Sequence, residues 1–190
     1  TGNGHLIIKA DLTNEKELDN LANQLPQLDG FVSNAGMAKM LPVQFFSQEA
    51  LNEVFNINCF SSMLLIKQLI KKKKLKKNSS VVFTASIAGY SNYIPTNGIY
   101  GSAKSALSTY MKYAALELAP KGIRCNAVHP GMVNTPLIDN RMLTEEDKTN
   151  DLKRYPLQRY GNPEDVAYAV IYLLSDAASW VTGSNIIIDG

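Results

Sequence analysis

Short apolar segments alternate with longer amphipathic ones along this chain, and no other feature of the sequence constrains its fold as strongly. Helices are expected over about residues 13–25, 48–74, 99–118 and 163–174. The apolar runs between and around them predict buried strands at residues 6–10, 31–33, 80–84, 123–128 and 185–188. Strands and helices in alternation indicate a parallel sheet with helices on both faces.

We therefore predict an α/β fold, a doubly wound parallel sheet with three α/β/α layers. The 190 residues can bury a sizeable core, and no linker or repeat divides them, so residues 1–190 should form one domain. Thr13 is the expected N-cap of the first helix, and residues 28–30 the turn after it. The polar segment 136–156 should carry short helices on a substrate-binding flap.

Charge and composition exclude several classes of protein. The net charge of +2 is too small to indicate a nucleic-acid partner, and no run of about 18 apolar residues predicts a membrane span. The basic run 71–77 fits the solvated last turn of a helix, with an electrostatic binding site as the alternative. Cys59 and Cys125 suggest no disulfide framework, and His5 and His129 no metal site. A cytoplasmic protein is the default expectation.

Polar and small residues follow several of the predicted strands. In parallel sheets, ligands gather at the carboxyl ends of the strands. A ligand site at that edge is therefore expected to include Asp11, the segment 34–36, Ser86 and the segment 129–131.

Tyr100 and Lys104 lie four residues apart near the start of a predicted helix, so their side chains share one face. A tyrosine with a pKa near 10 exchanges protons poorly at neutral pH, and a neighbouring ammonium lowers that pKa by favouring the phenolate. The pair is thus a candidate for acid–base catalysis. Taken alone, it is equally consistent with two residues on a helix surface.

Ser86 and Asn58 give this pair a context. Ser86 ends a strand fourteen residues before Tyr100, where its hydroxyl could hold a substrate carbonyl; the alternative is an ordinary turn serine. Asn58 lies inside a predicted helix, where an amide has below-average propensity. It could bond a water or a backbone carbonyl at a local distortion. The alternative is a surface asparagine, for which Asn56 serves as a control.

The ordered set Asn34-Ala35-Gly36, Asn58, Ser86, Tyr100 with Lys104, Pro130-Gly131 and Thr135 resembles the signature of the short-chain dehydrogenases/reductases. The resemblance covers essentially the whole chain and is strongest to the 3-oxoacyl-(acyl carrier protein) reductase group. It implies a Rossmann-like sheet and an NAD(P)-dependent oxidoreductase that acts on a ketone or secondary alcohol, possibly a 3-oxoacyl thioester.

The resemblance also implies roles for individual residues. Tyr100 would be the general acid, Lys104 would lower its pKa and bind the nicotinamide ribose, and Ser86 would polarise the substrate oxygen. Asn58 would hold a water in a proton relay. The implied cofactor-binding residues are Asp11 and Leu12 for adenine, Asn34, Ala35 and Gly36 beside the ribose, and Pro130, Gly131, Val133 and Thr135 for the carboxamide and pyrophosphate, besides Tyr100 and Lys104.

Two departures from the family pattern stand out. Ser33 replaces an asparagine that most members place before Asn34. The family's glycine-rich loop does not occur, so the family's two amino-terminal strands, with their helices, are expected to be absent from these residues. A longer protein of which this is one part is the favoured explanation, with a natural fragment or a proteolytic product as alternatives. The choice between NAD and NADP would depend on that part.

Other functions remain open at this level. A sugar or polyol dehydrogenase would share the same skeleton, and so would a non-catalytic binding or regulatory protein; a nucleotide-sugar epimerase would need a larger substrate domain. A homo-oligomer, most simply a tetramer, is expected because the helices over 48–74 and 99–118 are apolar nearly all round. In the second helix this rests on Ala103, Ala106, Leu107, Tyr110, Met111, Ala114, Ala115 and Leu118. Alternatively, an amino-terminal part covers these faces.

Overall fold

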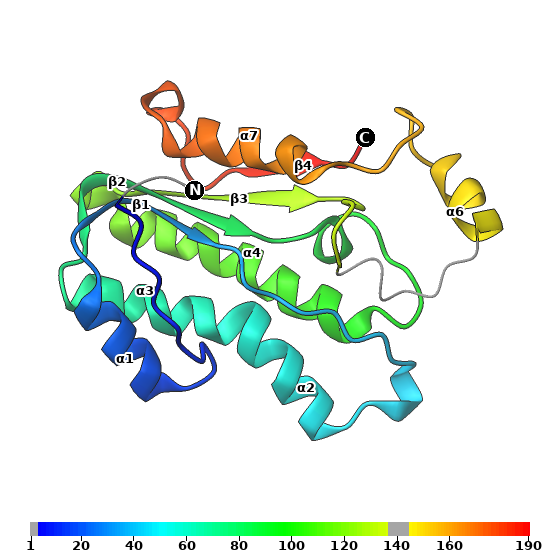
Figure 1. Ribbon diagram of the computed structural model, residues 1–190, viewed down its shortest axis with the longest axis horizontal. Helices are drawn as coiled ribbons and strands as arrows, with labels where there is room; N and C mark the ends of the chain where they lie inside the picture. The colour runs from blue at the N-terminus through cyan, green and yellow to red at the C-terminus, as the bar shows by residue number, and fades with distance from the viewer. Residues whose placement is uncertain (1–3, 137–144) are drawn as a thin grey trace.

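The computed structural model describes residues 4–136 and 145–190 (Figure 1). At its centre lies a parallel sheet in which each strand pairs with the next along the chain. The strands are β1 (Leu28–Ser33), β2 (Leu75–Thr84), β3 (Arg124–Pro130) and β4 (Asn185–Ile188). The predicted parallel α/β sheet is confirmed.

Helices cover both faces of this sheet, as Figure 1 shows. One face carries α1 (Glu15–Gln24), α2 (Gln48–Phe55), α3 (Ser61–Lys71) and α4 (Gly98–Leu118). The other face carries α7 (Pro163–Leu174), which begins and ends where the sequence predicts. The short helix α6 (Glu145–Leu152) belongs to the predicted flap, of which residues 137–144 lie outside the described part. The three-layer arrangement is therefore confirmed.

The carboxyl-terminal part of β2 is continuously apolar rather than alternating. Val81, Val82 and Phe83 are all fully buried. Val81 and Phe83 pack in the core with α1, α3 and α4, whereas Val82 packs with Leu173 of α7. A parallel strand covered on both faces has no solvent side to mark with polar residues.

The residues of α4 on which the assembly argument rests are mostly buried inside the chain itself. Of the eight, six are at most 8% exposed, and Ala106 and Tyr110 are partly buried against the same core. The large apolar side chains that α4 leaves at the surface are Tyr113 and Leu116, 61% and 74% exposed. The apolar circumference of α4 is thus largely explained by its own sheet and by the helices beside it.

Two predictions near the amino end are wrong. Residues 6–10 form no strand and pair with none of the described strands, and Ile7 is 93% exposed. A strand persists through hydrogen bonds to a neighbour, so an apolar run without one stays irregular. The N-cap of α1 is Asn14 rather than Thr13, because the Thr13 hydroxyl donates to Asp11 while Asn14 Oδ1 accepts from the backbone N–H groups of Lys16 and Glu17.

Both β1 and β2 begin earlier than predicted. The residues expected to form a turn at 28–30 open β1, because Leu28 pairs with the buried Leu75 at the start of β2. The basic segment 71–77 is therefore more than the end of a helix. After α3 the chain turns at Lys73, which has a left-handed backbone conformation (φ 56°), and the segment continues into β2. Lys72 binds Asp19 and Lys76 binds Asp29, each at 2.8 Å, so part of its charge is neutralised locally.

The single helix predicted over 48–74 is interrupted. Between α2 and α3 the chain forms one π-helical turn, Asn56–Phe60. Such turns insert one extra residue into a helix and frequently occur at functional sites. The turn contains both Asn56, which is partly exposed, and Asn58, which is fully buried.

Candidate active site

A cavity of about 1150 Å³ opens at the carboxyl ends of the strands, where the sequence predicts a ligand site. Its lining residues come from the segments after β1, β2 and β3 and from the first turns of α4. Residues in and near α6 and in α7 form further walls. The predicted site residues among its lining are Asn34, Gly36, Ser86, Tyr100, Lys104, Pro130, Gly131, Val133 and Thr135. Residues 100 positions apart in the sequence thus meet at one place.

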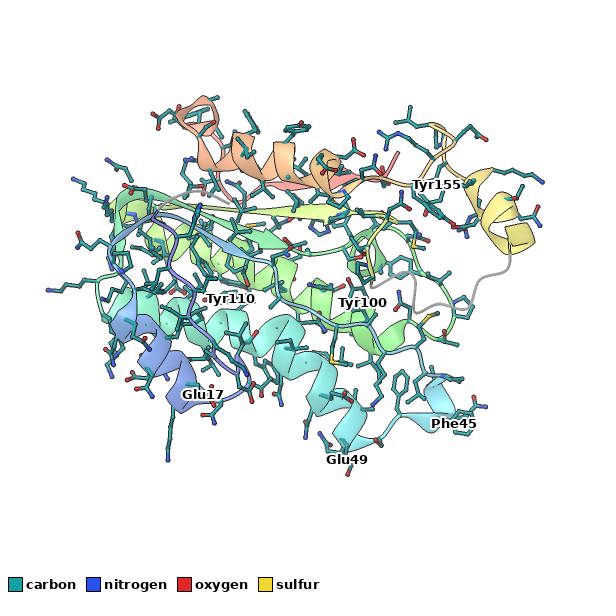
Figure 2. All side chains as sticks on the ribbon, viewed as in Figure 1. Glu17, Phe45, Glu49, Tyr100, Tyr110 and Tyr155 are labelled. Atoms are coloured by element: carbon teal, nitrogen blue, oxygen red, sulfur yellow. The ribbon has the colours of Figure 1, made fainter. Side chains whose placement is uncertain are left out.

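Tyr100 and Lys104 lie one turn apart on α4, and Figure 2 shows Tyr100 at the end of the helix near the carboxyl ends of the strands. The Lys104 Nζ lies 5.8 Å from the centroid of the Tyr100 ring and donates to the carbonyl of Thr84 at 2.8 Å. Lys104 is only 3% exposed, and its burial lowers the pKa of the ammonium to about 8. The alternative of two residues on a helix surface is wrong for Lys104.

Asn58 is held by three hydrogen bonds, and it is not a surface asparagine. Its Oδ1 accepts from Met37 N–H at 3.2 Å, and its Nδ2 donates to the carbonyls of Met37 at 2.8 Å and Val54 at 2.9 Å. The amide lies in the π-helical turn, a local distortion of the kind that the first of the two interpretations of Asn58 requires. Asn58 therefore fastens the loop after β1 to the helix, just behind the cavity wall.

Gly36 lies where that loop passes closest to the buried groups. A Cβ atom at this position would meet Asn58 Oδ1 at 2.7 Å and Lys104 Nζ at 3.3 Å. Gly36 lines the cavity, so its missing side chain leaves backbone exposed to whatever the cavity holds. This backbone, the nearby Asn34 and the buried ammonium together line one wall of the cavity.

Ser86 caps the short helical turn Ile87–Gly89 and is 9% exposed. Its Oγ accepts from Ala88 N–H at 3.2 Å, which leaves the hydroxyl proton to donate into the cavity. The turn lies directly on α4: a Cβ at Gly89 would meet Ser105 N at 2.6 Å, and one at Gly101 would meet the Ala88 carbonyl at 2.7 Å. These close approaches bring Ser86 to the cavity that Tyr100 lines.

Four of the predicted residues do not line the cavity. Asn58 lies behind it, and Ala35 lies between two lining residues. Asp11 and Leu12 precede α1, and the Asp11 carboxylate accepts from the N–H and hydroxyl of Thr13 at 2.8 and 2.7 Å. Those hydrogen bonds, the backbone one first, lower the pKa of Asp11. The Asp11 side chain is thus hydrogen-bonded within a local turn.

Asn97 is a lining residue that the sequence reasoning missed. It is 4% exposed, and its Oδ1 is buried without a hydrogen-bond partner in the described chain. A signal was present, since Asn97 precedes Tyr100 by three residues and so lies on the same side of the helix start. The flap adds polar lining residues, Asp151, Arg154 and Tyr155, the last labelled in Figure 2.

Within residues 4–136 and 145–190, no three His, Cys, Asp or Glu side chains gather as metal ligands. No helix in the same ranges has both the length and the apolarity to cross a membrane.

Comparison with known proteins gives concordant matches over the chain. A family model described as enoyl-(acyl carrier protein) reductase matches residues 1–190. The 3-oxoacyl-[acyl-carrier-protein] reductase FabG of Rickettsia felis is 34% identical over 95% of this chain and 73% of its own length. Cyclopentanol dehydrogenase of Comamonas sp. is 33% identical over 100% of this chain and 76% of its own.

A solved structure agrees. A short chain dehydrogenase family protein from Francisella tularensis superposes with a TM-score of 0.88 at 33% identity, covering 96% of this chain and 79% of that one. The chain therefore belongs to the short-chain dehydrogenase/reductase family, and it is an oxidoreductase that uses NAD or NADP to interconvert carbonyl and CH–OH groups.

Proposed function

We propose that Tyr100, Ser86, Lys104 and Asn58 carry out the proton chemistry of a ketone reduction in this chain. The observation that carries the proposal is the buried ammonium of Lys104, held between the Tyr100 ring and the Thr84 carbonyl at the cavity wall. When bound, the nicotinamide supplies the hydride that attacks the carbonyl carbon. The protein supplies the proton for the carbonyl oxygen and the geometry of both.

Tyr100 donates its phenolic proton to the substrate oxygen as negative charge develops there. Ser86 directs its hydroxyl proton to the same oxygen, because its own oxygen is already engaged by Ala88 N–H. Two donors from two elements thus fix the carbonyl between them, and preorganised donors at the site of developing charge contribute most to such catalysis.

The phenolate left on Tyr100 is stabilised by the adjacent ammonium of Lys104. A pKa of about 8 makes that ammonium exchange protons readily near neutral pH. Asn58 lies beyond Lys104 and holds the Met37 backbone, so a water bound there would connect the ammonium to solvent. Proton return to Tyr100 follows this route.

Residues around the strand ends hold the cofactor. Asn34, Ala35 and Gly36 form the wall beside the adenosine ribose, and Lys104 binds the nicotinamide ribose. Pro130, Gly131, Val133 and Thr135 follow β3 at the other side of the cavity, where they bind the carboxamide and pyrophosphate. Asp11 and Leu12 lie outside the cavity lining, and the resemblance to the family assigns them to the adenine.

For the substrate we propose a 3-oxoacyl thioester, which a 34% identical relative reduces by its name. The apolar lining residues Ile94, Met132 and Val166 suit an acyl chain better than a sugar, whose hydroxyls need many polar partners. The flap over residues 136–156 makes this choice. A sugar or polyol dehydrogenase is the second candidate, favoured by the polar Asn92, Asn97 and Arg154.

A substrate panel tests these alternatives. The full-length protein is mixed with NADPH or NADH and with acetoacetyl-coenzyme A, cyclopentanone or a ketose, and the loss of reduced nicotinamide is followed. The largest kcat/KM is expected for the thioester. Faster reduction of the ketose would establish the sugar or polyol enzyme, and cofactor binding without turnover of any carbonyl would indicate a non-catalytic protein.

We also propose a cytoplasmic homotetramer. Cys59 and Cys125 are free and buried, as suits a reducing compartment. Large apolar side chains remain exposed on α4, at Tyr113 and Leu116, and on the opposite layer at Tyr168 of α7. Two separate apolar faces on opposite layers support two different two-fold contacts, which together build a tetramer.

A further inference from the structure

His129 lies at the end of β3, fully buried, and it does not line the cavity. Its Nδ1 lies 3.0 Å from the backbone carbonyl of Ser86, and its Nε2 lies 3.3 Å from the hydroxyl of Ser108 on α4. The Ser108 hydroxyl also donates to Oδ1 of Asn185 on β4 at 3.2 Å. A chain of polar contacts therefore runs from β4 through α4 and β3 to Ser86.

The chemistry of the partners fixes the direction of the hydrogen bond between His129 and Ser86. A backbone carbonyl only accepts, so the proton between His129 and Ser86 must sit on Nδ1. A ring that carries its proton on Nδ1 presents Nε2 as an acceptor, and the Ser108 hydroxyl lies 3.3 Å from it. The same hydroxyl donates to Asn185 Oδ1, so Nε2 and this amide oxygen share the single Ser108 proton. The direction of the contact with Ser86 is defined whichever acceptor the Ser108 proton serves.

The hydrogen bond from His129 is made to the backbone carbonyl of Ser86 itself, and the position of this backbone sets the direction of the Ser86 side chain. The Ser86 carbonyl accepts from Gly89 N–H at 3.2 Å as well as from His129, so both of its lone pairs are used. The preceding residue, Ala85, donates to the Val128 carbonyl at 2.9 Å. The Tyr90 ring, with its centroid 4.9 Å from that of His129, covers the imidazole.

We propose that His129 is a positioning residue, which holds the Ser86 backbone through Nδ1 and thereby orients the Ser86 hydroxyl toward the substrate oxygen. This rests on the proposed role of Ser86. Misplacement of a catalytic group by about 1 Å can lower turnover on the order of a hundredfold. The opposing view is that His129 only fills the core, in which case its effect has no connection with Ser86.

Two isosteric variants separate these views. In His129→Asn the amide nitrogen takes the position of Nδ1 and can still donate to the Ser86 carbonyl. In His129→Gln it takes the position of Nε2 and reaches only the Ser108 side. We expect His129→Asn to keep kcat within about threefold of wild type and His129→Gln to lose tenfold or more, with unchanged affinity for the reduced cofactor. Equal kcat values for the two variants would overturn the proposal.

A double-variant cycle removes the ambiguity that a folding defect would bring. In a Ser86→Ala background the hydroxyl to be positioned is gone, so His129→Gln should lower kcat no further. The same fold loss of kcat in both backgrounds would show that His129 acts only through general stability. A wild-type protein that reduces no carbonyl would contradict the proposed function instead.

A measurement without activity tests the geometry directly. The chain has two histidines, and His5 is exposed, so the imidazole nitrogen signals are readily assigned by long-range ¹H–¹⁵N correlation NMR. His129 should carry its proton on Nδ1 in wild type, and Ser108→Ala should perturb its Nε2 signal. A ring protonated on Nε2 alone would leave no donor for Ser86 and would overturn the proposal.

Discussion

The ammonium of Lys104 lies 5.8 Å from the centroid of the Tyr100 ring, one helical turn away, and donates to the Thr84 carbonyl at the end of β2. One cation is therefore tied at once to the sheet and to the proposed proton donor.

Tyr100→Phe removes the proposed proton donor and keeps the aromatic ring. General acid catalysis typically contributes a hundredfold or more, so kcat should fall at least that far in the full-length protein. The thermal midpoint should hardly change. Steady-state rates and a melting curve measure both, and retention of more than about a tenth of kcat would refute the assignment.

Lys104→Met should abolish activity and stabilise the fold at neutral pH. Burial lowers the pKa of Lys104 from 10.5 to about 8, so burying the charged form costs ~3 kcal/mol. The variant loses the hydrogen bond to Thr84, which offsets ~1 kcal/mol of the expected gain in stability. At pH 7 both folded and unfolded states are protonated, and the wild type carries the full penalty.

The pH dependence of that difference follows from the same pKa. Between pH 8 and 10.5 the folded wild type loses the proton while its unfolded chain keeps it, so wild-type stability rises with pH relative to the variant. Urea unfolding of both proteins across this window should show the gap closing. A gap that does not change with pH would mean that Lys104 is not buried as a cation.

Asn58→Ala and Asn56→Ala form a matched pair within one π-helical turn. The first removes three hydrogen bonds and leaves the Met37 N–H without its acceptor, so we expect a loss of ~1–3 kcal/mol in stability together with a lower kcat. The second changes a partly exposed side chain and should be nearly silent. Equal effects of the two substitutions on kcat would show that Asn58 has no role in the proton relay.

Gly36→Ala adds a methyl group where the loop after β1 meets Asn58 and Lys104. The new Cβ would meet Asn58 Oδ1 at 2.7 Å, so the loop must move and the cofactor dissociation constant should rise about tenfold or more. Gly161→Ala is the control, since its nearest neighbour would lie at an ordinary 3.5 Å. Fluorescence titration with reduced cofactor compares them, and unchanged binding by Gly36→Ala would argue against the ribose wall.

The tetramer is tested by light scattering over a dilution series. Tyr168→Glu on α7 should reduce the assembly to dimers, because a charge in a buried apolar contact is strongly unfavourable. Tyr93→Glu changes a loop tyrosine that is even more exposed than Tyr168, and it should leave the mass unchanged. A wild-type monomer at micromolar concentration would contradict the tetramer.

The parts of the fold that follow from local pattern could be predicted from the sequence. The helix α7 begins at Pro163 and ends at Leu174 as predicted, because a capping residue, a proline and regular apolar spacing act together there. The strand at residues 6–10 could not be assessed in that way, since an apolar run becomes a strand only beside a partner. Thr13 and Asn14 are both good caps, and the contact of Thr13 with Asp11 decides between them.

The residues of the candidate site likewise fall into those that could be predicted from the sequence and those that could not. Spacing alone placed Tyr100 beside Lys104, and the strand ends placed Ser86 and Gly36 at one edge. Burial was harder to foresee: no local pattern of burial or spacing distinguishes Asn58, which is fully buried, from its neighbour Asn56. The unpartnered Oδ1 of Asn97 likewise depends on how α4 meets the loop before it.

The two close backbone approaches at Gly89 and Gly101 have a mechanical consequence. Because the turn that carries Ser86 lies on α4 without intervening side chains, the turn and the helix have almost no compressible layer between them. Any rocking of α4 must carry Ser86 along with Tyr100. The two hydroxyls then keep their spacing, and the proposed catalytic pair behaves as one rigid body.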